Sequence, residues 1–201
     1  MPFVSLEGVD GAGKSTHVGW MADWLRARGH AVVETREPGG TPLGESLRDL
    51  LLGQAMCPDT ELLLMFAARA EHIHQVIRPA LARGEWLLSD RFTDASYAYQ
   101  CGGRGIPAER LHVLEQWVQH GLQPDITFVF DVDLAIARQR LAAHGAADRF
   151  EQEDGAFFSR VQHVYRQRAA AEPARVRLVN TDRTLDQIRA DLVGMLLEIG
   201  A

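Results

Sequence analysis

The sequence predicts an α/β fold in which a five-stranded parallel sheet carries helices on both faces. Short apolar runs alternate with segments of helical periodicity along the 201 residues, an order typical of parallel strands joined by crossover helices. The apolar runs are nearly uninterrupted, as strands buried on both faces require. Because 46% of the residues are hydrophobic, the chain can bury one sizeable core, and we expect a single domain over residues 1–201.

The first expected strand, Phe3–Leu6, leads into a glycine-rich loop that fits the pattern G-x-x-x-x-G-K-S/T: Gly8-Val9-Asp10-Gly11-Ala12-Gly13-Lys14-Ser15-Thr16. Such a loop turns its backbone N–H groups toward phosphate oxygens, and the following helix adds the positive end of its dipole. Lys14 can bind the β- and γ-phosphates of ATP, and the Ser15 hydroxyl can ligate Mg²⁺. A chance glycine-rich turn is the alternative, but a strand before the loop and a helix after it are both indicated. These features predict a three-layer P-loop NTPase fold.

The next elements follow in order along the chain. A second strand is expected at residues 31–35, then a turn at 36–42, a helix through 47–51 that ends at Gly53, and a long helix at 59–83 with a kink at Pro79. The third strand, 85–89, ends at Asp90-Arg91.

The second half of the chain continues the alternation. A helix at 93–100 stops at the breaker 102–105, and Pro107 is expected as the first residue of a helix that runs to His120. The last elements are a strand at 125–131, a helix at 134–143, a polar loop at 145–155, a helix at 156–171, a strand at 176–179 and a helix at 185–199.

The composition excludes several classes of protein. With 21 Lys and Arg against 27 Asp and Glu, the net charge is −6 and there is no basic stripe, so we expect no nucleic-acid partner. No apolar run approaches the ~20 residues of a membrane helix, so we expect no membrane partner. Cys57 and Cys101 lack metal or redox spacing and are typical of free thiols. A strand beginning at Phe3 leaves no room for a signal peptide, and we expect a cytoplasmic protein.

Four arginines at strand ends or on the long helix indicate a second anion site: Arg36, Arg48, Arg69 and Arg91. Ligands of parallel sheets bind at the carboxyl ends of the strands, where these residues are expected. The planar guanidinium group suits bidentate capture of a phosphate. Each arginine singly is more often a solvated surface residue, but together they indicate an acceptor that carries its own phosphate. Phosphoryl transfer needs positioning and charge neutralisation rather than a covalent nucleophile.

Besides the glycine-rich loop, the chain contains five distinctive stretches: Thr35-Arg36-Glu37-Pro38-Gly39-Gly40-Thr41, Met65-Phe66-Ala67-Ala68-Arg69, Asp90-Arg91-Phe92, Tyr97-Ala98-Tyr99-Gln100 and Gly102-Gly103-Arg104-Gly105. Together with the loop, they resemble the bacterial thymidylate kinases over nearly the whole chain. The loop alone is shared by many enzymes, whereas the first and third of these stretches together are specific. The resemblance implies transfer of the γ-phosphate of ATP to dTMP, giving dTDP and ADP, with Mg²⁺ required and a homodimer as the assembly.

The resemblance also implies roles for the residues that would contact the phosphates. Lys14 and Ser15 would serve ATP and its metal within the loop Gly8–Thr16. Arg91, with Arg36 and Arg48, would hold the acceptor phosphate. Asp10 would lie near the deoxyribose 3′-hydroxyl and these arginines.

A further set of residues would contact the nucleoside. By the same resemblance, Phe66 or its neighbour Met65 covers a face of thymine, and Arg69 donates to its O4. Ser96 and Gln100 contact the edge of the base, and Tyr99 crowds the 2′ position so that ribose is disfavoured. A cis peptide bond between Glu37 and Pro38 is expected to shape the sugar pocket.

Several of these interpretations have structural alternatives. Phe66 lies in an apolar helical stretch where core packing is equally expected. Tyr99 can be a helix residue whose hydroxyl bonds to the backbone. For the whole chain, the alternatives are another nucleoside monophosphate or deoxynucleoside kinase, or a nucleotide-dependent switch. The Asn-Lys-x-Asp run typical of a guanine-specific switch does not occur in the sequence.

Residues 138–155 are expected to form a lid over ATP. The resemblance implies a helper cation either in the glycine-rich loop or in the lid. The loop offers no basic residue before Lys14, so we expect the lid to supply it. One lid position that is often arginine in related proteins is His144 here, and a neutral imidazole stabilises phosphate charge poorly. We therefore expect Arg149, assisted by Arg140, to close onto the transferred group.

The long helix also carries a signal for assembly. Between Leu62 and Ile77 it is apolar on more than one face. Such a helix needs a second cover, and a symmetric homodimer is the commonest way to provide it.

Overall fold

The computed structural model describes residues 2–142 and 148–201. Its centre is a five-stranded sheet in the order β2-β3-β1-β4-β5, in which all neighbouring strands are parallel. The strands are β1 (Phe3–Glu7), β2 (Val32–Arg36), β3 (Trp86–Asp90), β4 (Ile126–Asp131) and β5 (Val176–Asn180). The predicted parallel sheet is confirmed, and each end of each strand lies within one residue of the predicted bound.

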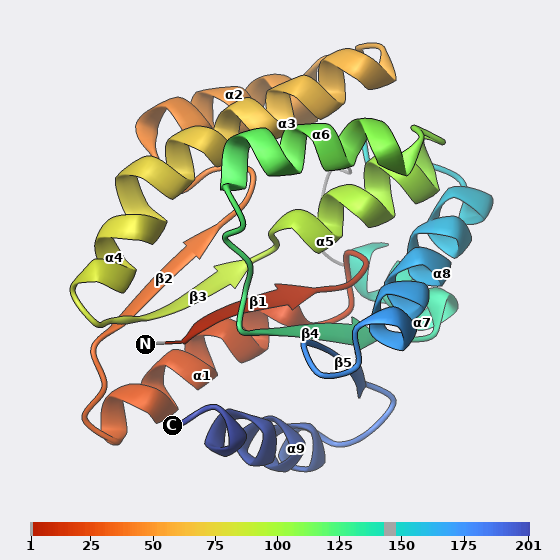
Figure 1. Cartoon of the computed structure of the whole chain (residues 1–201). Helices are drawn as coiled ribbons and strands as arrows, with labels where there is room; N and C mark the ends of the chain where they lie inside the picture. Colours follow the sequence, from red (N-terminus) through yellow and green to blue (C-terminus); the bar gives the residue numbers. More distant parts are fainter. Residues whose placement is uncertain (1, 143–147) are drawn as a thin grey trace.

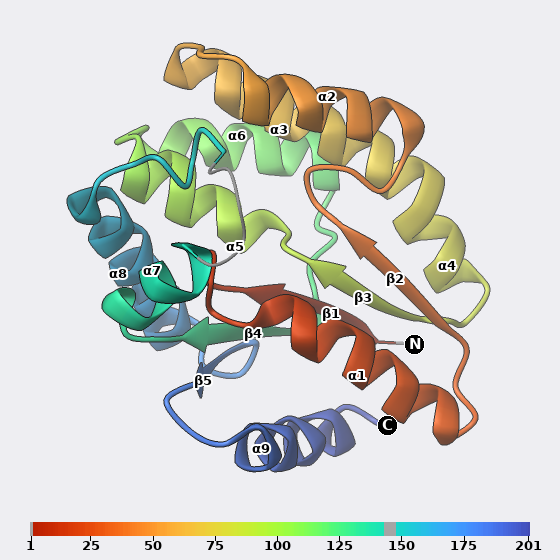
Figure 2. The same ribbon diagram turned by 180° about the vertical axis from the view of Figure 1, so that it is seen from behind.

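Helices cover both faces of the sheet (Figure 1). One face carries α1 (Lys14–Ala27) and α9 (Leu185–Glu198), and the other carries α3 (Pro58–His72), α4 (Arg78–Ala82), α5 (Thr93–Ser96), α6 (Ala108–Gln119) and α8 (Gly155–Ala171). Seen from behind, α2 (Pro42–Gly53) lies outside α3, farthest from the sheet (Figure 2). The short helix α7 (Leu134–Ala142) lies beside the loop that follows β1.

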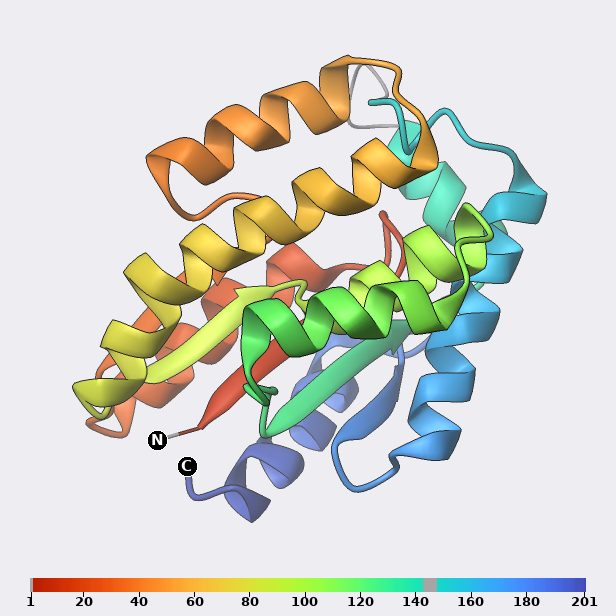
Figure 3. The same cartoon turned by 45° about the horizontal axis from the view of Figure 1, so that its top comes forward.

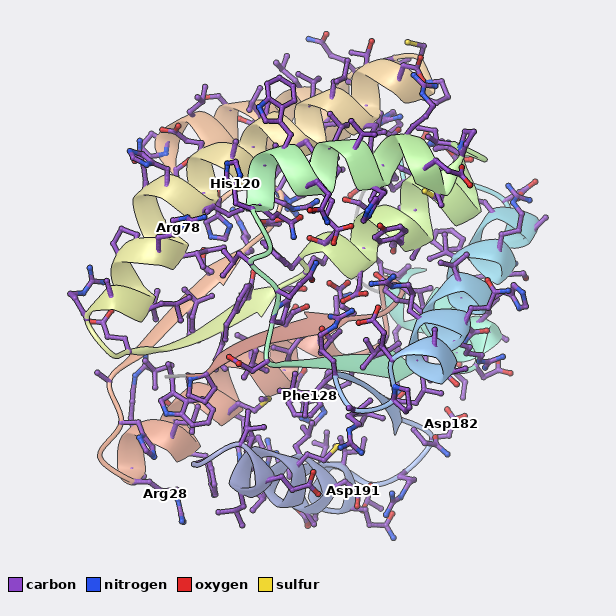
Figure 4. All side chains as sticks on the ribbon, viewed as in Figure 1. Arg28, Arg78, His120, Phe128, Asp182 and Asp191 are labelled. Carbon is purple, nitrogen blue, oxygen red and sulfur yellow. The ribbon has the colours of Figure 1, made fainter. Side chains whose placement is uncertain are left out.

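The main core joins the central strands to helices on both faces. Phe128 on β4 has no exposed surface and lies in the middle of the layers (Figure 4). Leu25 of α1 and Leu192 of α9 belong to the same cluster, as does Val161 of α8 on the opposite face. Burial of these side chains fixes the sheet between its helices. None of the helices in the described part of the chain is long and apolar enough to cross a membrane.

The helical run predicted at 59–83 is confirmed to within one residue at each end, but a π-helical turn that was not predicted interrupts it just before Pro79. After α3, a π-helical turn, η1 (Ile73–Ile77), precedes α4. The N–H of Arg78 bonds to the carbonyl of Ile73, five residues earlier. The next residue, Pro79, has no N–H with which to continue an α-helical ladder. Arg78 also reaches the carbonyl of Gln119, and Figure 4 shows Arg78 beside His120 at this corner.

The segment after β3 also differs from the prediction. Here α5 passes into a second π-helical segment, η2 (Tyr97–Gly103), so the expected breaker at 102–105 begins inside the helical run. A Cβ on Gly103 would lie 2.4 Å from the Phe157 ring of α8, and the close packing of η2 against α8 therefore requires glycine. Pro107 is the residue before α6 rather than its first residue.

Candidate active site

The glycine-rich loop leaves the sheet at the carboxyl end of β1 (Figure 3). Gly8 has φ of 131°, and a Cβ on it would lie 2.6 Å from the carbonyl oxygen of Phe130 on the neighbouring strand β4. Only glycine fits this position. After the turn, α1 begins at Lys14, and its first residues line a cavity of about 620 Å³. The helix therefore directs its positive dipole end and its free N–H groups into that cavity.

Lys14 is buried at the start of α1, with 6% of its surface exposed. Its Nζ donates to the carbonyls of Gly8 at 3.1 Å and Val9 at 3.2 Å, and lies 3.7 Å from Oδ1 of Asp10. Burial and the positive charge of Arg91 lower the pKa of Lys14, and the charge of Asp10 opposes them. The ammonium group is thus held at the loop with carbonyl and carboxylate neighbours.

The large cavity collects the residues that the sequence analysis assigned to phosphate binding. Ser15 and Thr16 at the start of α1 line it with exposed side chains. Arg36 from the end of β2 and Arg48 from α2 lie on its wall, together with Arg140 from α7. Its other lining residues are Asp10, Gly11, Ala12, Gly13, Lys14, His17, Glu37, Asp90, Arg91, Leu141, Glu151, Thr181, Arg183, Leu185 and Ile188.

Arg91 lies where this cavity meets a second one. Its Nη2 donates to Oδ1 of Asp10 at 2.5 Å and to the hydroxyl of Tyr99 at 3.1 Å, and its Nη1 donates to the carbonyl of Gly8 at 3.0 Å. Burial by itself raises the pKa of Asp10, but the charges of Arg91 and Lys14 outweigh it and lower the pKa to about 2. Asp10 is therefore ionised at neutral pH and pairs with both cations.

The second cavity lies against the first and shares four residues with it: Asp10, Glu37, Arg48 and Arg91. Its other lining residues are Pro38, Leu52, Met65, Arg69, Phe92, Ala95, Ser96, Tyr99, Gln100, Asp148 and Phe150. The large cavity has the glycine-rich loop on its wall, whereas the wall of the second cavity is partly apolar. Two ligands bound in them would meet at the shared charged residues.

Arg69 is the most buried cation of the second cavity, with 2% of its surface exposed. Its Nε donates to Oε2 of Glu37 at 2.7 Å, and its Nη2 donates to Oγ of Ser96 at 3.0 Å and to the carbonyl of Phe92 at 3.1 Å. Its Nη1 is buried and finds no partner among the described residues. A buried guanidinium N–H without an acceptor is costly, and this one belongs to a side chain that lines the second cavity.

Glu37 holds Arg69 in place through a chain of buried polar groups. Its Oε1 lies 2.9 Å from Nδ1 of His72, and Nε2 of the same ring lies 2.6 Å from Oγ1 of Thr35. Burial by itself raises the pKa of Glu37, but the Arg69 charge and the His72 hydrogen bond outweigh it, and the pKa is lowered. The expected cis peptide bond between Glu37 and Pro38 is confirmed.

The structure distinguishes between the two neighbours that could cover a base. Met65 lies on the wall of the second cavity. Phe66 is 2% exposed and packs with Leu62 and Leu111, while the Arg69 guanidinium lies 4.6 Å from the centre of its ring. Met65 is therefore the side chain in position to contact a ligand, and Phe66 supports Arg69 from the core.

The remaining nucleoside-binding candidates are brought together on the opposite wall. Ser96, Tyr99 and Gln100 all line the second cavity from α5 and η2. Nε2 of Gln100 donates to Oε1 of the buried Glu61 at 2.9 Å. Tyr99 donates its hydroxyl hydrogen to Asp10 at 3.2 Å, so it is held against the charged end of the cavity.

Arg36 and Arg48 keep protein partners while they face the large cavity. Arg36 pairs with Glu45, with Nη2 and Oε2 separated by 2.7 Å, and about half of its side chain is exposed. Arg48 donates from Nη1 to the carbonyl of Pro38 at 3.0 Å. Because Arg36, Arg48 and Arg91 line one cavity, the predicted cluster of cations is present.

The two expected lid cations lie in different surroundings. Arg140 donates from Nη1 to the carbonyl of Gly11 at 3.3 Å, beside the glycine-rich loop. Arg149 donates from Nη1 to Oε2 of Glu61 at 2.7 Å and from Nε to the carbonyl of Leu51 at 3.0 Å. It thereby fastens the chain next to Phe150 over the second cavity rather than over the loop. His144 lies outside the described residues.

Sequence reasoning missed the residues that close the second cavity from the lid side. Asp148 and Phe150 line it, and Phe150 packs edge-on against the ring of Tyr99 at 5.9 Å between centroids. An apolar aromatic residue inside a polar stretch was a signal that could have identified Phe150. Leu52, near the end of α2, also lines the cavity. The apolar periodicity of α2 alone does not indicate that this leucine faces a cavity.

Comparisons with known proteins identify the family to which the chain belongs. The model of the family described as thymidylate kinase matches residues 6–192. The chain is 59% identical over 197 residues to a thymidylate kinase of Thiobacillus denitrificans, covering 98% of this chain and 97% of that protein. A thymidylate kinase of Bordetella petrii is 60% identical over 190 residues, which cover 94% of this chain and 92% of that protein. The crystal structure of a thymidylate kinase from Ehrlichia chaffeensis superposes with a TM-score of 0.80 and 32% identity, covering 98% of each chain.

Proposed function

We propose, because this chain belongs to the thymidylate kinase family, that it transfers the γ-phosphate of ATP directly to dTMP in a Mg²⁺-dependent step without a covalent intermediate. The family makes the protein a nucleoside monophosphate kinase of nucleotide biosynthesis, with ATP as donor and dTMP as acceptor. The roles of individual residues, the metal and the assembly are part of the proposal. We also propose that residues 1–201 act as one domain, with 138–155 as its lid.

The large cavity suits the triphosphate of ATP. The N–H groups of the loop Gly8–Thr16 and the ammonium group of Lys14 would bind its β- and γ-phosphates. In the described part of the chain, no cluster of three or more His, Cys, Asp or Glu side chains could hold a metal ion by itself. Mg²⁺ would therefore be held by the exposed hydroxyl of Ser15 together with phosphate oxygens, where it would neutralise phosphate charge.

The single observation that carries the assignment of the acceptor is the unpaired Nη1 of Arg69. Its position in the second cavity supports a hydrogen bond to a carbonyl oxygen of a base, such as O4 of thymine. Met65 would cover a face of the base, while Ser96 and Gln100 would contact its edge. Tyr99 would crowd the 2′ position of the sugar. These roles place the acceptor phosphate at the end of the cavity that Arg91 and Asp10 form.

Charge neutralisation supports direct transfer between the two cavities. Arg36, Arg48 and Arg91 would bind the acceptor phosphate, and Asp10 would orient Arg91 while it lies near the 3′-hydroxyl. Arg140, next to the loop, supports the role of a cation on the transferred phosphoryl group. The contribution of Arg149 to that group stays a prediction, since its observed partners, Glu61 and the carbonyl of Leu51, lie outside the glycine-rich loop.

The choice of acceptor is tested by measuring ADP release from purified protein with dTMP, dUMP, dGMP and thymidine as acceptors. We expect the highest kcat/KM for dTMP and no turnover with thymidine, which lacks the phosphate that the arginines would bind. An Arg69→Met variant should raise KM for dTMP, whereas Arg28→Met, at the far end of α1 (Figure 4), should not. Preference of the unaltered protein for dGMP or thymidine would overturn the proposal.

We further propose a homodimer through a surface formed by α3 and α6. These helices pack side by side on the outside of the molecule (Figure 3). Leu63 on α3 is 56% exposed, and Val113 and Trp117 on α6 are 65% and 72% exposed. An apolar patch of this kind is typical of a protein interface and supports a second copy as its cover.

A further inference from the structure

Glu7 is a buried carboxylate that none of the proposed roles uses. It is the last residue of β1, directly before the glycine-rich loop, and it has no exposed surface. Its Oε1 accepts hydrogen bonds from the backbone N–H of Phe92 at 2.7 Å and from the hydroxyl of Ser5 at 3.0 Å. Its Oε2 accepts one from the hydroxyl of Tyr165 at 2.8 Å. Such a group must be fully satisfied to be tolerated in the core.

Two of these contacts lead to Arg91. Phe92 is the residue after Arg91, so its amide fixes the backbone at that point. Tyr165, on α8 and 1% exposed, has its hydroxyl oxygen 3.4 Å from Nη1 of Arg91. Arg91 itself has φ of 74°, a left-handed conformation that a residue with a side chain rarely adopts. A strained residue keeps its conformation only when its surroundings hold it, and Glu7 supplies part of that support.

The direction of the hydrogen bonds requires a carboxylate at this position. The Glu7 side chain accepts three hydrogen bonds and does not need to donate one. The single hydroxyl hydrogen of Tyr165 goes to Glu7, which leaves the lone pairs of the Tyr165 oxygen to accept from Arg91. An amide or a protonated acid on that side would donate to Tyr165 instead. The hydrogen bond that the Tyr165 oxygen would then accept from residue 7 would compete with the one that it accepts from the N–H of Arg91.

We propose that Glu7, acting through Tyr165 and the amide of Phe92, is a positioning residue that aims the Arg91 guanidinium at the acceptor phosphate. This inference rests on the proposed function for the role of Arg91. It adds a second line of support to the direct contact with Asp10, from the opposite side of the guanidinium. Glu7 lies outside the residues that line the two cavities, so among the described residues its effect reaches them through its partners.

The electrostatics around Glu7 make this support depend on pH. Burial and the negative charge of Asp94 on α5 raise the pKa of Glu7 to about 7. The positive charge of Arg91 and the hydrogen bonds from Phe92 and Tyr165 oppose the rise. The charge of Glu7 in turn acts to raise the pKa of Lys14 at the start of α1. The carboxylate that Tyr165 needs is thus present in full only above neutral pH.

A kinetic double-mutant cycle tests the positioning role. Glu7→Gln should raise KM for dTMP by about tenfold, while KM for ATP changes by less than about twofold. In a Tyr165→Phe background the same substitution should change KM for dTMP by less than about threefold, because only the contact with the amide of Phe92 is left for Glu7 to act through. The matched control is Glu115→Gln. Glu115, on α6, is another buried carboxylate that accepts a hydrogen bond from a tyrosine hydroxyl, that of Tyr97 at 2.6 Å.

The pH profile separates positioning from general support of the fold. In the unaltered protein, kcat/KM for dTMP should fall on the acid side with a pKa near that of Glu7, about 7. In Glu7→Gln this limb should disappear. Only the second ionisation of the substrate phosphate, with a pKa of about 6, should then shape the acid side of the profile. A merely structural role would lower activity at every pH and leave the limb in place.

The outcomes are distinguishable. An unaltered protein that fails to phosphorylate dTMP would overturn the proposed function. Normal activity with dTMP, combined with a Glu7→Gln variant that keeps both the acid limb and the KM for dTMP, would overturn the role of Glu7 alone. If Glu7→Gln does not fold, as judged by its circular dichroism, Tyr165→Phe carries the test. That variant should raise KM for dTMP selectively, and equal increases for dTMP and ATP would overturn the inference.

Discussion

Asp10 and Arg91 form an ion pair of 2.5 Å although 81 residues separate them in the chain. Asp10 lies in the loop after β1 and Arg91 directly after β3, and these two strands are neighbours in the sheet. Both residues line both cavities. The pair therefore stands at the point where the donor and acceptor phosphates would meet.

Substitution of Asp10 by Asn should lower kcat/KM for dTMP by a factor on the order of 10², because it frees the Arg91 guanidinium from its principal partner. With a pKa of about 2, Asp10 is ionised throughout the accessible pH range, so the loss should be the same at pH 6 and pH 9. Steady-state kinetics at both pH values check this. A loss confined to KM for ATP would contradict it.

The two lid arginines should behave differently when each is replaced by alanine. Arg140→Ala should lower kcat by a factor on the order of 10³, the size typical of a cation on the transferred phosphoryl group. Arg149→Ala should mainly raise KM for dTMP, because its contact with Glu61 fastens the wall that carries Phe150. Single-turnover and steady-state rates distinguish the two. A larger loss of kcat in Arg149→Ala would restore that residue as the closing cation.

Met65 and Phe66 are neighbours with different expected effects. Met65→Ala should raise KM for dTMP and leave stability nearly unchanged, because this side chain is half-buried on the cavity wall. Phe66→Ala should destabilise the protein by about 3–5 kcal/mol, because it removes a buried ring from a packed cluster. Urea unfolding and kinetics on both variants check the contrast. Equal destabilisation by both substitutions would contradict it.

The apolar surface on α3 and α6 should mediate self-association. Trp117→Glu introduces a charge at a side chain that is 72% exposed, and it should convert the dimer into a monomer while leaving the monomer folded. Light scattering after gel filtration measures the change. The matched control is Leu197→Glu on α9, where the side chain is 47% exposed and lies on another face. A monomeric unaltered protein would rule out this interface.

Glu7 should also affect stability as a function of pH. Its pKa rises from 4.5 to about 7 on folding, so the folded state retains a proton that the unfolded chain has lost. This contribution to stability is present below pH 4.5 and is lost as pH rises to 7, and its size is on the order of 3 kcal/mol. The free energy of unfolding, measured by urea titration at pH 5 and 7.5, should show this dependence in the unaltered protein. Glu7→Gln should not show it.

Much of the architecture could be predicted because it depends on local patterns. The apolar run before Gly8, the turn at that glycine and the helix from Lys14 are encoded by neighbouring residues, and so are the other strands. The π-helical segments η1 and η2 were missed because apolar periodicity does not distinguish them from an α-helix. The helical run ends within the predicted breaker, but it extends through Gly103, which packs closely against α8.

The site was predictable where residues lie in characteristic stretches and not where they act through tertiary contacts. Arg48 and Arg91 were expected at a phosphate and do line one cavity. Whether Met65 or Phe66 faces the ligand depends on the rotation of α3, which the sequence leaves open. Arg149 was expected over the loop, but its partner Glu61 is 88 residues away in the chain. Glu7 was not singled out, since nothing local indicates that Tyr165 reaches it.

The lack of a side chain at Gly103 bears on how this enzyme could be engineered. Any larger residue there would push the Phe157 ring, and with it α8, away from η2. Tyr165 is carried on the same helix, two turns further along, so its hydroxyl would withdraw from Arg91. Libraries that diversify the nucleoside pocket should therefore keep this glycine constant. Otherwise catalytic losses that originate on the outer side of η2 would be mistaken for changes in substrate recognition.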